Sequence, residues 1–65
     1  MLNFTNHLAT WASECGRATI QQLQANRFMI KVDGLYLNSE ESLFEAKYSA
    51  WRRVVANDEL ANKLR

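Results

Sequence analysis

The alternation of apolar and polar residues is clearest between Phe28 and Asn38, where it predicts a β-hairpin. The apolar positions of this stretch are Phe28, Ile30, Val32, Leu35 and Leu37. Their phase shifts by one at Asp33-Gly34, which a two-residue turn with positive φ at both positions explains. Such a turn sets Val32 opposite Leu35 and Ile30 opposite Leu37, so that all five apolar side chains share one face.

Residues 5–25 show a different spacing, in which apolar residues recur at steps of three and four and predict a helix. These residues are Phe4, Leu8, Trp11, Ala12, Cys15, Ala18 and Leu23. Asn3 or Thr5 can cap this helix, and Asn26 can end it. Gly16 is unfavourable inside a helix, and close packing against another backbone is the explanation that we favour over simple tolerance.

A second helix is predicted after the hairpin, with Asn38 or Ser39 as its N-cap. Its apolar residues form two ridges. Leu43, Ala50 and Val54 make the first ridge, and Phe44, Tyr48, Trp51 and Val55 make the second. The first can pack on the rest of the chain while the second meets a partner. The pattern weakens at residues 57–59, where Asp58 can cap a last turn, and we expect residues 59–65 to fray.

The order of elements predicts an α+β fold in which two helices pack on one face of a small antiparallel sheet. An alternative keeps only residues 28–32 as a strand, paired with its copy across a dimer axis. The chain contains no proline, linker composition or internal repeat, so residues 1–65 are expected to form a single domain.

Size and composition point to self-association. A chain of 65 residues buries a limited core, and one cysteine, Cys15, cannot form an internal disulfide. Hydrophobic residues make up 48% of the sequence, including two Trp, three Phe and two Tyr, and a dimer interface would shelter some of them. The unpaired thiol, together with the lack of a signal peptide or a long apolar run, predicts a cytoplasmic protein without a membrane segment.

Candidate chemistry is sparse. His7 and Cys15 are the only residues of their kind, so the chain can assemble neither a Cys-His pair on one helix face nor a zinc site from His and Cys alone. The acidic residues Glu40, Glu41 and Glu45 fit the start of a helix. We therefore expect no catalytic, cofactor-binding or metal site and no enzymatic activity.

The function that we expect is binding. In size, composition and aromatic content the chain resembles accessory proteins of phages, prophages or plasmids, which bind and modulate host machinery. The expected partners are a second copy of the chain and a host or cellular protein. The expected interface residues are aromatic or apolar, because such residues dominate interface energetics: Tyr36, Phe44, Tyr48, Trp51, Val55 and Met29.

The alternative function is DNA binding. Its candidate contacts are Arg27, Lys31, Arg52 and Arg53, with aromatic side chains nearby in sequence. The net charge of +1 excludes a strong overall field but not a local basic patch. A hairpin followed by a capped helix is similar in shape to the DNA-binding modules of phage integrase arm domains and plant AP2 domains. Those modules have three strands where two are expected here.

Overall fold

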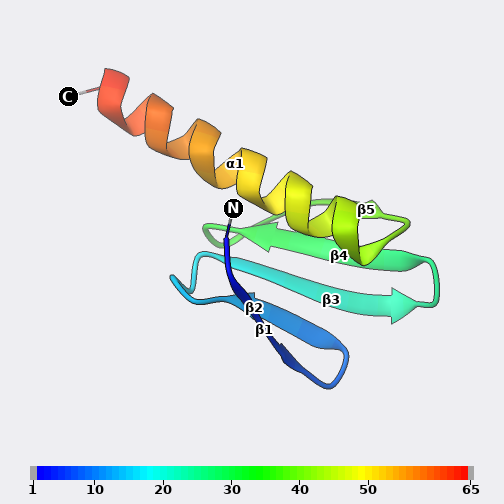
Figure 1. The fold of residues 1–65 in the computed structure, drawn as a ribbon. Coiled ribbons are helices and arrows are strands. Elements are labelled where there is room, and N and C mark those ends of the chain that lie inside the picture. Colours follow the sequence, from blue (N-terminus) through cyan, green and yellow to red (C-terminus); the bar gives the residue numbers. More distant parts are fainter. Residues whose placement is uncertain (1, 65) are drawn as a thin grey trace.

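Five antiparallel strands and one C-terminal helix make up the fold in a computed structural model, which describes residues 2–64 (Figure 1). The elements are β1 (Phe4–His7), β2 (Thr10–Ser13), β3 (Ala18–Gln24), β4 (Arg27–Val32), β5 (Leu35–Glu40) and α1 (Leu43–Lys63). Each strand pairs with the next along the chain, so the sheet is a simple meander in the order β1-β2-β3-β4-β5. The predicted order of helix, hairpin and helix is therefore wrong, since the described residues contain a single helix.

The N-terminal helix expected over residues 5–25 is replaced by most of β1 and by all of β2 and β3. Its apparent helical spacing came from short strands separated by turns. Leu8 lies in the turn between β1 and β2 with φ 57° and an exposed fraction of 84%, so it is not part of an apolar stripe. Gly16 has φ 76° in the turn before β3, and a Cβ built there would meet nothing within 4 Å. Its positive φ, rather than close packing, explains the glycine.

The predicted hairpin is confirmed as β4 and β5. Asp33 and Gly34 have φ of 51° and 86°, and Val32 pairs with Leu35 as the turn requires. The register shifts further along, because Lys31 pairs with Tyr36 but Met29 pairs with Ser39, and the expected pair of Ile30 with Leu37 is not formed. This bulge turns the end of β5, so that Glu40 pairs with Phe28. The alternative of one strand paired only across a dimer is wrong, since β4 pairs with both β3 and β5 of its own chain.

Helix α1 begins later than predicted. Ser42 is its N-cap, and the Ser42 hydroxyl oxygen accepts a hydrogen bond from the backbone N–H of Glu45 at 3.2 Å. Asn38 and Ser39, the expected caps, belong to β5. The helix continues without a break through residues 57–59, so Asp58 caps no separate turn. The fraying expected for residues 59–65 stays a prediction, and Arg65 lies outside the described residues.

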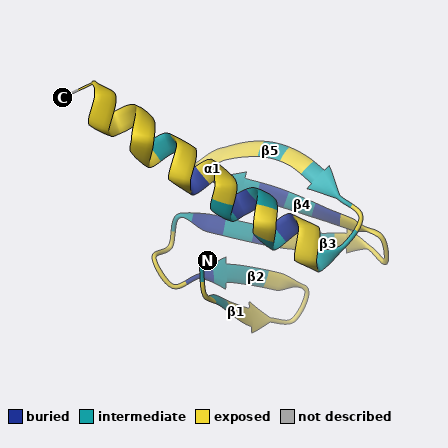
Figure 2. Ribbon diagram, turned by 45° about the horizontal axis from the view of Figure 1, so that its top comes forward, coloured by how far each residue is buried: buried dark blue, intermediate teal, exposed yellow. Residues whose placement is uncertain are grey.

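One face of the sheet packs against α1 and holds the core (Figure 2). The buried apolar residues are Ala18, Ile20, Phe28, Ile30, Val32, Ala46, Ala50 and Val54. Their alternation along β3 and β4 follows the two-residue period of a strand, whereas on α1 they recur every four residues. Because Ala46 and Ala50 are small and fully buried, the helix backbone lies close to the sheet.

A polar cluster fixes the C-terminal half of α1 to the sheet. The Arg17 guanidinium donates two hydrogen bonds of 2.8 Å to the Asp33 carboxylate and one of 2.7 Å to Asp58 of α1. The Asn57 amide also donates to Asp33, at 2.8 Å. The hydrogen bonds from Arg17, and then from Asn57, lower the pKa of Asp33 to about 2. The turn after β4, the loop before β3 and the helix are thus joined.

Candidate interaction surfaces

The outer side of α1 carries an apolar stripe that the sheet does not cover. We call Phe44, Tyr48, Trp51 and Val55 the α1 ridge. Phe44 is 72% exposed, Tyr48 45% and Val55 36%, while Trp51 is half-buried. The Tyr48 and Trp51 rings lie against each other with their centroids 5.8 Å apart. The ridge is the second ridge expected from the sequence, and the first, at Ala50 and Val54, is buried against the sheet.

The face of the sheet opposite α1 is the second surface, which we call the open sheet face (Figure 1). The strand register aligns two rows of side chains across all five strands on this face. One row is Thr5, Ala12, Thr19, Lys31 and Tyr36, and the other is His7, Thr10, Gln21, Met29 and Ser39. Neither row contains an acidic residue. The Lys31 ammonium lies 5.2 Å from the centroid of the Tyr36 ring, within the range of a cation–π interaction.

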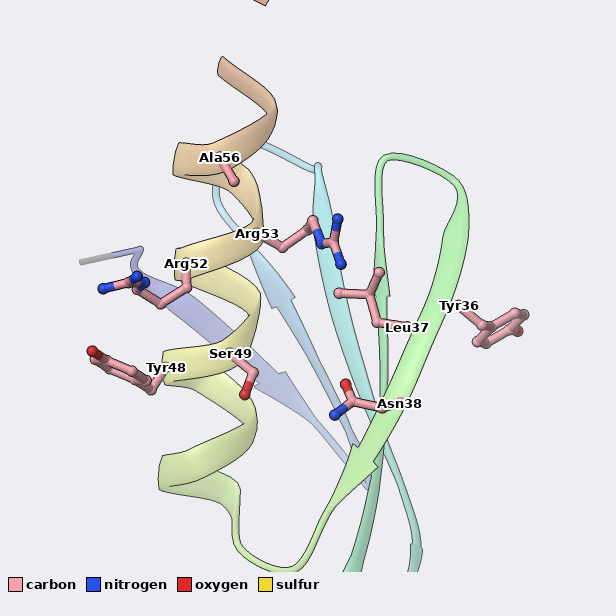
Figure 3. Close-up of a pocket in the computed structure, with 8 residues that line it drawn as sticks. All are labelled: Tyr36, Leu37, Asn38, Tyr48, Ser49, Arg52, Arg53 and Ala56. Carbon is pink, nitrogen blue, oxygen red and sulfur yellow. The ribbon is translucent and has the colours of Figure 1, made fainter. Parts of the chain in front are cut away.

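A groove of about 810 Å³ separates β5 from α1 (Figure 3). It is lined by Tyr36, Leu37, Asn38, Tyr48, Ser49, Arg52, Arg53 and Ala56. Leu37, Asn38, Ser49 and Arg53 point into the groove, whereas Tyr36 points away from it beyond β5. Arg52 and Arg53 form no ion pair with another described residue, since the ion pairs of residues 2–64 both involve Arg17.

The structure divides the expected interface residues between two surfaces. Phe44, Tyr48, Trp51 and Val55 come together on the α1 ridge, while Met29 and Tyr36 lie on the open sheet face.

The structure also divides the expected DNA contacts between two surfaces. Arg27 and Lys31 alternate with buried Phe28 and Ile30 along β4 and so belong to the open sheet face. Arg52 and Arg53 project from α1, on the other side of the sheet.

The N-terminal strands contribute residues that the sequence analysis missed. Thr5, Thr10, Thr19 and Gln21 line the open sheet face, but they had been assigned to a helix. The signal that could have found them is the alternation of Ala18 and Ile20 with Thr19 and Gln21, which has the period of a strand. This short alternation was hidden by the longer apparent helical spacing around it.

The residues with the most reactive side chains remain apart. His7 is exposed at the end of β1. Cys15 is exposed in the turn before β3, and not on the apolar side of a helix, where its spacing had placed it. A hydrogen bond between the Cys15 thiol and the Ser13 hydroxyl, 3.3 Å apart, lowers the pKa of Cys15. Within residues 2–64 no three His, Cys, Asp or Glu side chains are grouped so that they could hold a metal ion.

No described helix combines the length and the apolar character that crossing a bilayer requires. Comparison of the chain with family models, curated proteins and solved structures finds no match. The structural class is therefore defined by the fold itself, a five-stranded antiparallel meander with one C-terminal helix. The α1 ridge and the open sheet face are the basis for assigning a function.

Proposed function

We propose that this chain is a small non-enzymatic protein that binds another protein through the α1 ridge. The observation that carries the proposal is the exposure of Phe44, Tyr48 and Val55 in one continuous stripe beside Trp51. Exposed apolar patches of this kind mark interaction sites in soluble proteins, and aromatic side chains supply most of the binding energy when a partner buries them.

Core packing does not require this stripe. Ala46, Ala50 and Val54 on the opposite side of α1 already fill the contact with the sheet. Substitutions at Phe44 and Tyr48 should therefore change binding with little effect on the free energy of unfolding. This separation makes the ridge testable without loss of the fold.

The partners that we propose are a second copy of the chain and a host or cellular protein that the binding modulates, as in small phage, prophage or plasmid accessory proteins. We place the binding in the cytoplasm, because an exposed lone thiol such as Cys15 is compatible with a reducing compartment. In that compartment Cys15 would stay a free thiol.

Affinity capture from cells that encode the protein tests the proposal. The wild type is compared with the double variant Phe44→Ser/Tyr48→Ser and with Leu35→Ser, a control whose side chain is 70% exposed but lies off the ridge. We expect at least one protein to be enriched with the wild type and the control and to be lost with the double variant. Equal recovery with all three chains would contradict binding through the ridge.

A second candidate function is binding of duplex DNA by the open sheet face. It is favoured by the two rows of side chains without a carboxylate and by the placement of Arg27, Lys31 and Tyr36 on the same face. The resemblance to sheet-and-helix DNA-binding modules required a third strand, and β3 to β5 followed by α1 supply it. A sheet face of this kind can enter the major groove, with cations contacting phosphates.

The double variant Arg27→Glu/Lys31→Glu tests this candidate against the matched pair Arg52→Glu/Arg53→Glu on α1. Fluorescence anisotropy with a labelled duplex should show affinity that falls steeply with salt and is lost in the β4 variant but kept in the α1 variant. Salt-independent binding, or equal loss in both variants, would exclude the open sheet face as the DNA contact.

A further inference from the structure

We propose that a second copy of this chain occupies the α1 ridge, with its own α1 packed antiparallel to the first. The two-fold axis crosses the ridge midway between Tyr48 and Trp51. This inference rests on the proposed function, because it identifies the partner of the same surface. In this dimer the two protomers contact each other through their α1 helices.

The spacing of the ridge is the first argument. Its residues stand at positions 44, 48, 51 and 55, so the steps are four, three and four and are the same in both directions along the helix. When two such ridges meet antiparallel, Phe44 lies opposite the partner's Val55 and Tyr48 lies opposite the partner's Trp51. Alternating steps of three and four also form the seam along which two helices pack at about 20°.

The charges beside the ridge are the second argument. Glu45 and Arg52 each follow a ridge residue by one position and lie on the same flank of the helix, two turns apart. Neither forms an ion pair within residues 2–64. The antiparallel arrangement places Glu45 near the partner's Arg52 and, by symmetry, Arg52 near the partner's Glu45. A parallel arrangement would instead put this flank of one helix on the opposite side of the seam from the same flank of its partner, so that Glu45 would not meet the partner's Arg52.

The shape of the helix surface is the third argument. A shallow hollow of about 200 Å³ lies beside the ridge and is lined by Trp51, Arg52, Val55, Ala56 and Glu59. In the proposed pair the partner's Phe44 lies opposite Val55 and therefore faces this hollow. Phe44 is the most exposed aromatic side chain of the described chain, at 72%, and no core contact holds it in its own helix. It is therefore the side chain that is free to enter the hollow.

Sedimentation equilibrium on the full chain, from about 10 µM to about 1 mM, tests the pairing. We expect a reversible dimer for the wild type and for Leu35→Ser, and a monomer for Phe44→Ser/Tyr48→Ser. Circular dichroism checks that each variant is folded. A wild type that remains monomeric over this range, or a double variant that dimerises as tightly as the wild type, would overturn the inference.

A charge exchange tests the antiparallel geometry by a route that does not depend on the aromatic residues. The single variants Glu45→Arg and Arg52→Glu each replace two attractive contacts per dimer with two repulsive ones. Each should raise the dissociation constant about 5- to 30-fold, and added salt should reduce the effect. Mixing the two single variants restores both attractive contacts, so the mixture should form a heterodimer more tightly than either variant forms a homodimer. A mixture that associates no better than its components would overturn the antiparallel arrangement.

The outcome also separates this inference from the proposed function. A monomeric wild type whose ridge still captures a different protein would overturn the second copy as partner and leave the proposed function standing. A dimer that is insensitive to the ridge variants, together with capture that is equally insensitive, would overturn both. Dimerisation that is lost with Phe44→Ser/Tyr48→Ser and shows the charge exchange would support the inference and identify the occupant of the ridge.

Discussion

Replacing Gly34 with residues that carry a Cβ should destabilise the protein by an amount that the backbone alone determines. Gly34 has φ 86°, and a Cβ built there would meet no atom within 4 Å. Crowding by neighbours therefore contributes nothing, and only the left-handed conformation opposes the substitution. For an ordinary L-residue that conformation costs about 1–2 kcal/mol. Gly34→Ala should show this cost, and β-branched Gly34→Val should show a larger one.

Thermal unfolding followed by circular dichroism measures the effect. For a domain of this size 1 kcal/mol corresponds to a shift in Tm of about 4–8 °C, so Gly34→Ala should lower the Tm by about 4–16 °C. Gly34→Asn is the matched control, because asparagine adopts positive φ more readily than other residues that carry a Cβ, and its Tm should fall least. If Gly34→Ala, Gly34→Asn and the wild type unfolded at the same temperature, the positive φ at this position, and with it the Asp33-Gly34 turn, would be refuted.

Three further predictions concern the core, the helix cap and the polar cluster. Ile30→Ala, at a fully buried position, should lower the free energy of unfolding by about 2–5 kcal/mol, a large part of the roughly 3–10 kcal/mol expected for 65 residues, and urea titration should find its unfolding midpoint far below that of the wild type. Ser42→Ala should cost about 1 kcal/mol in the same assay by removing the N-cap hydrogen bond, whereas Ser39→Ala should not show this loss. The lowered pKa of Asp33 stabilises the folded state above about pH 4, and this contribution is lost as the pH falls toward 2, so acid titration of Asp33→Asn should show a smaller decline in stability over that interval than the wild type.

The hairpin could be predicted because its signal is local. Its strands are six residues long, the buried residues of β4 alternate over its whole length, and Asp33-Gly34 marks the turn. The bulge between Tyr36 and Ser39 of β5 could not be found in this way. The bulge leaves Glu40 opposite Phe28, and the Glu40 carboxylate accepts a hydrogen bond of 3.3 Å from the Ser49 hydroxyl of α1. Contacts between residues far apart in sequence decide such details.

The first three strands were missed because each offers little pattern. Strands β1 and β2 are four residues long, so each places only two side chains on the core face. Two alternations cannot be distinguished from chance, while apolar residues drawn from several strands and turns happened to recur at helical steps. Gly16 is evidence against the helix, since its cost there had to be explained by a close packing that the structure does not show. In the structure its positive φ shows that it belongs to a turn.

The ridges of α1 could be predicted because the period of a helix assigns residues to faces without knowledge of the rest of the fold. What the sequence could not show was which ridge the sheet would cover and how closely. Covering the sheet requires small side chains, and Ala46 and Ala50 meet that need with no exposed surface. The large side chains at Phe44 and Tyr48 are consequently left on the outside, where neither belongs to the core that α1 forms with the sheet. Because exposing aromatic surface to water is unfavourable, the exposure of the ridge supports the proposal that a partner buries it.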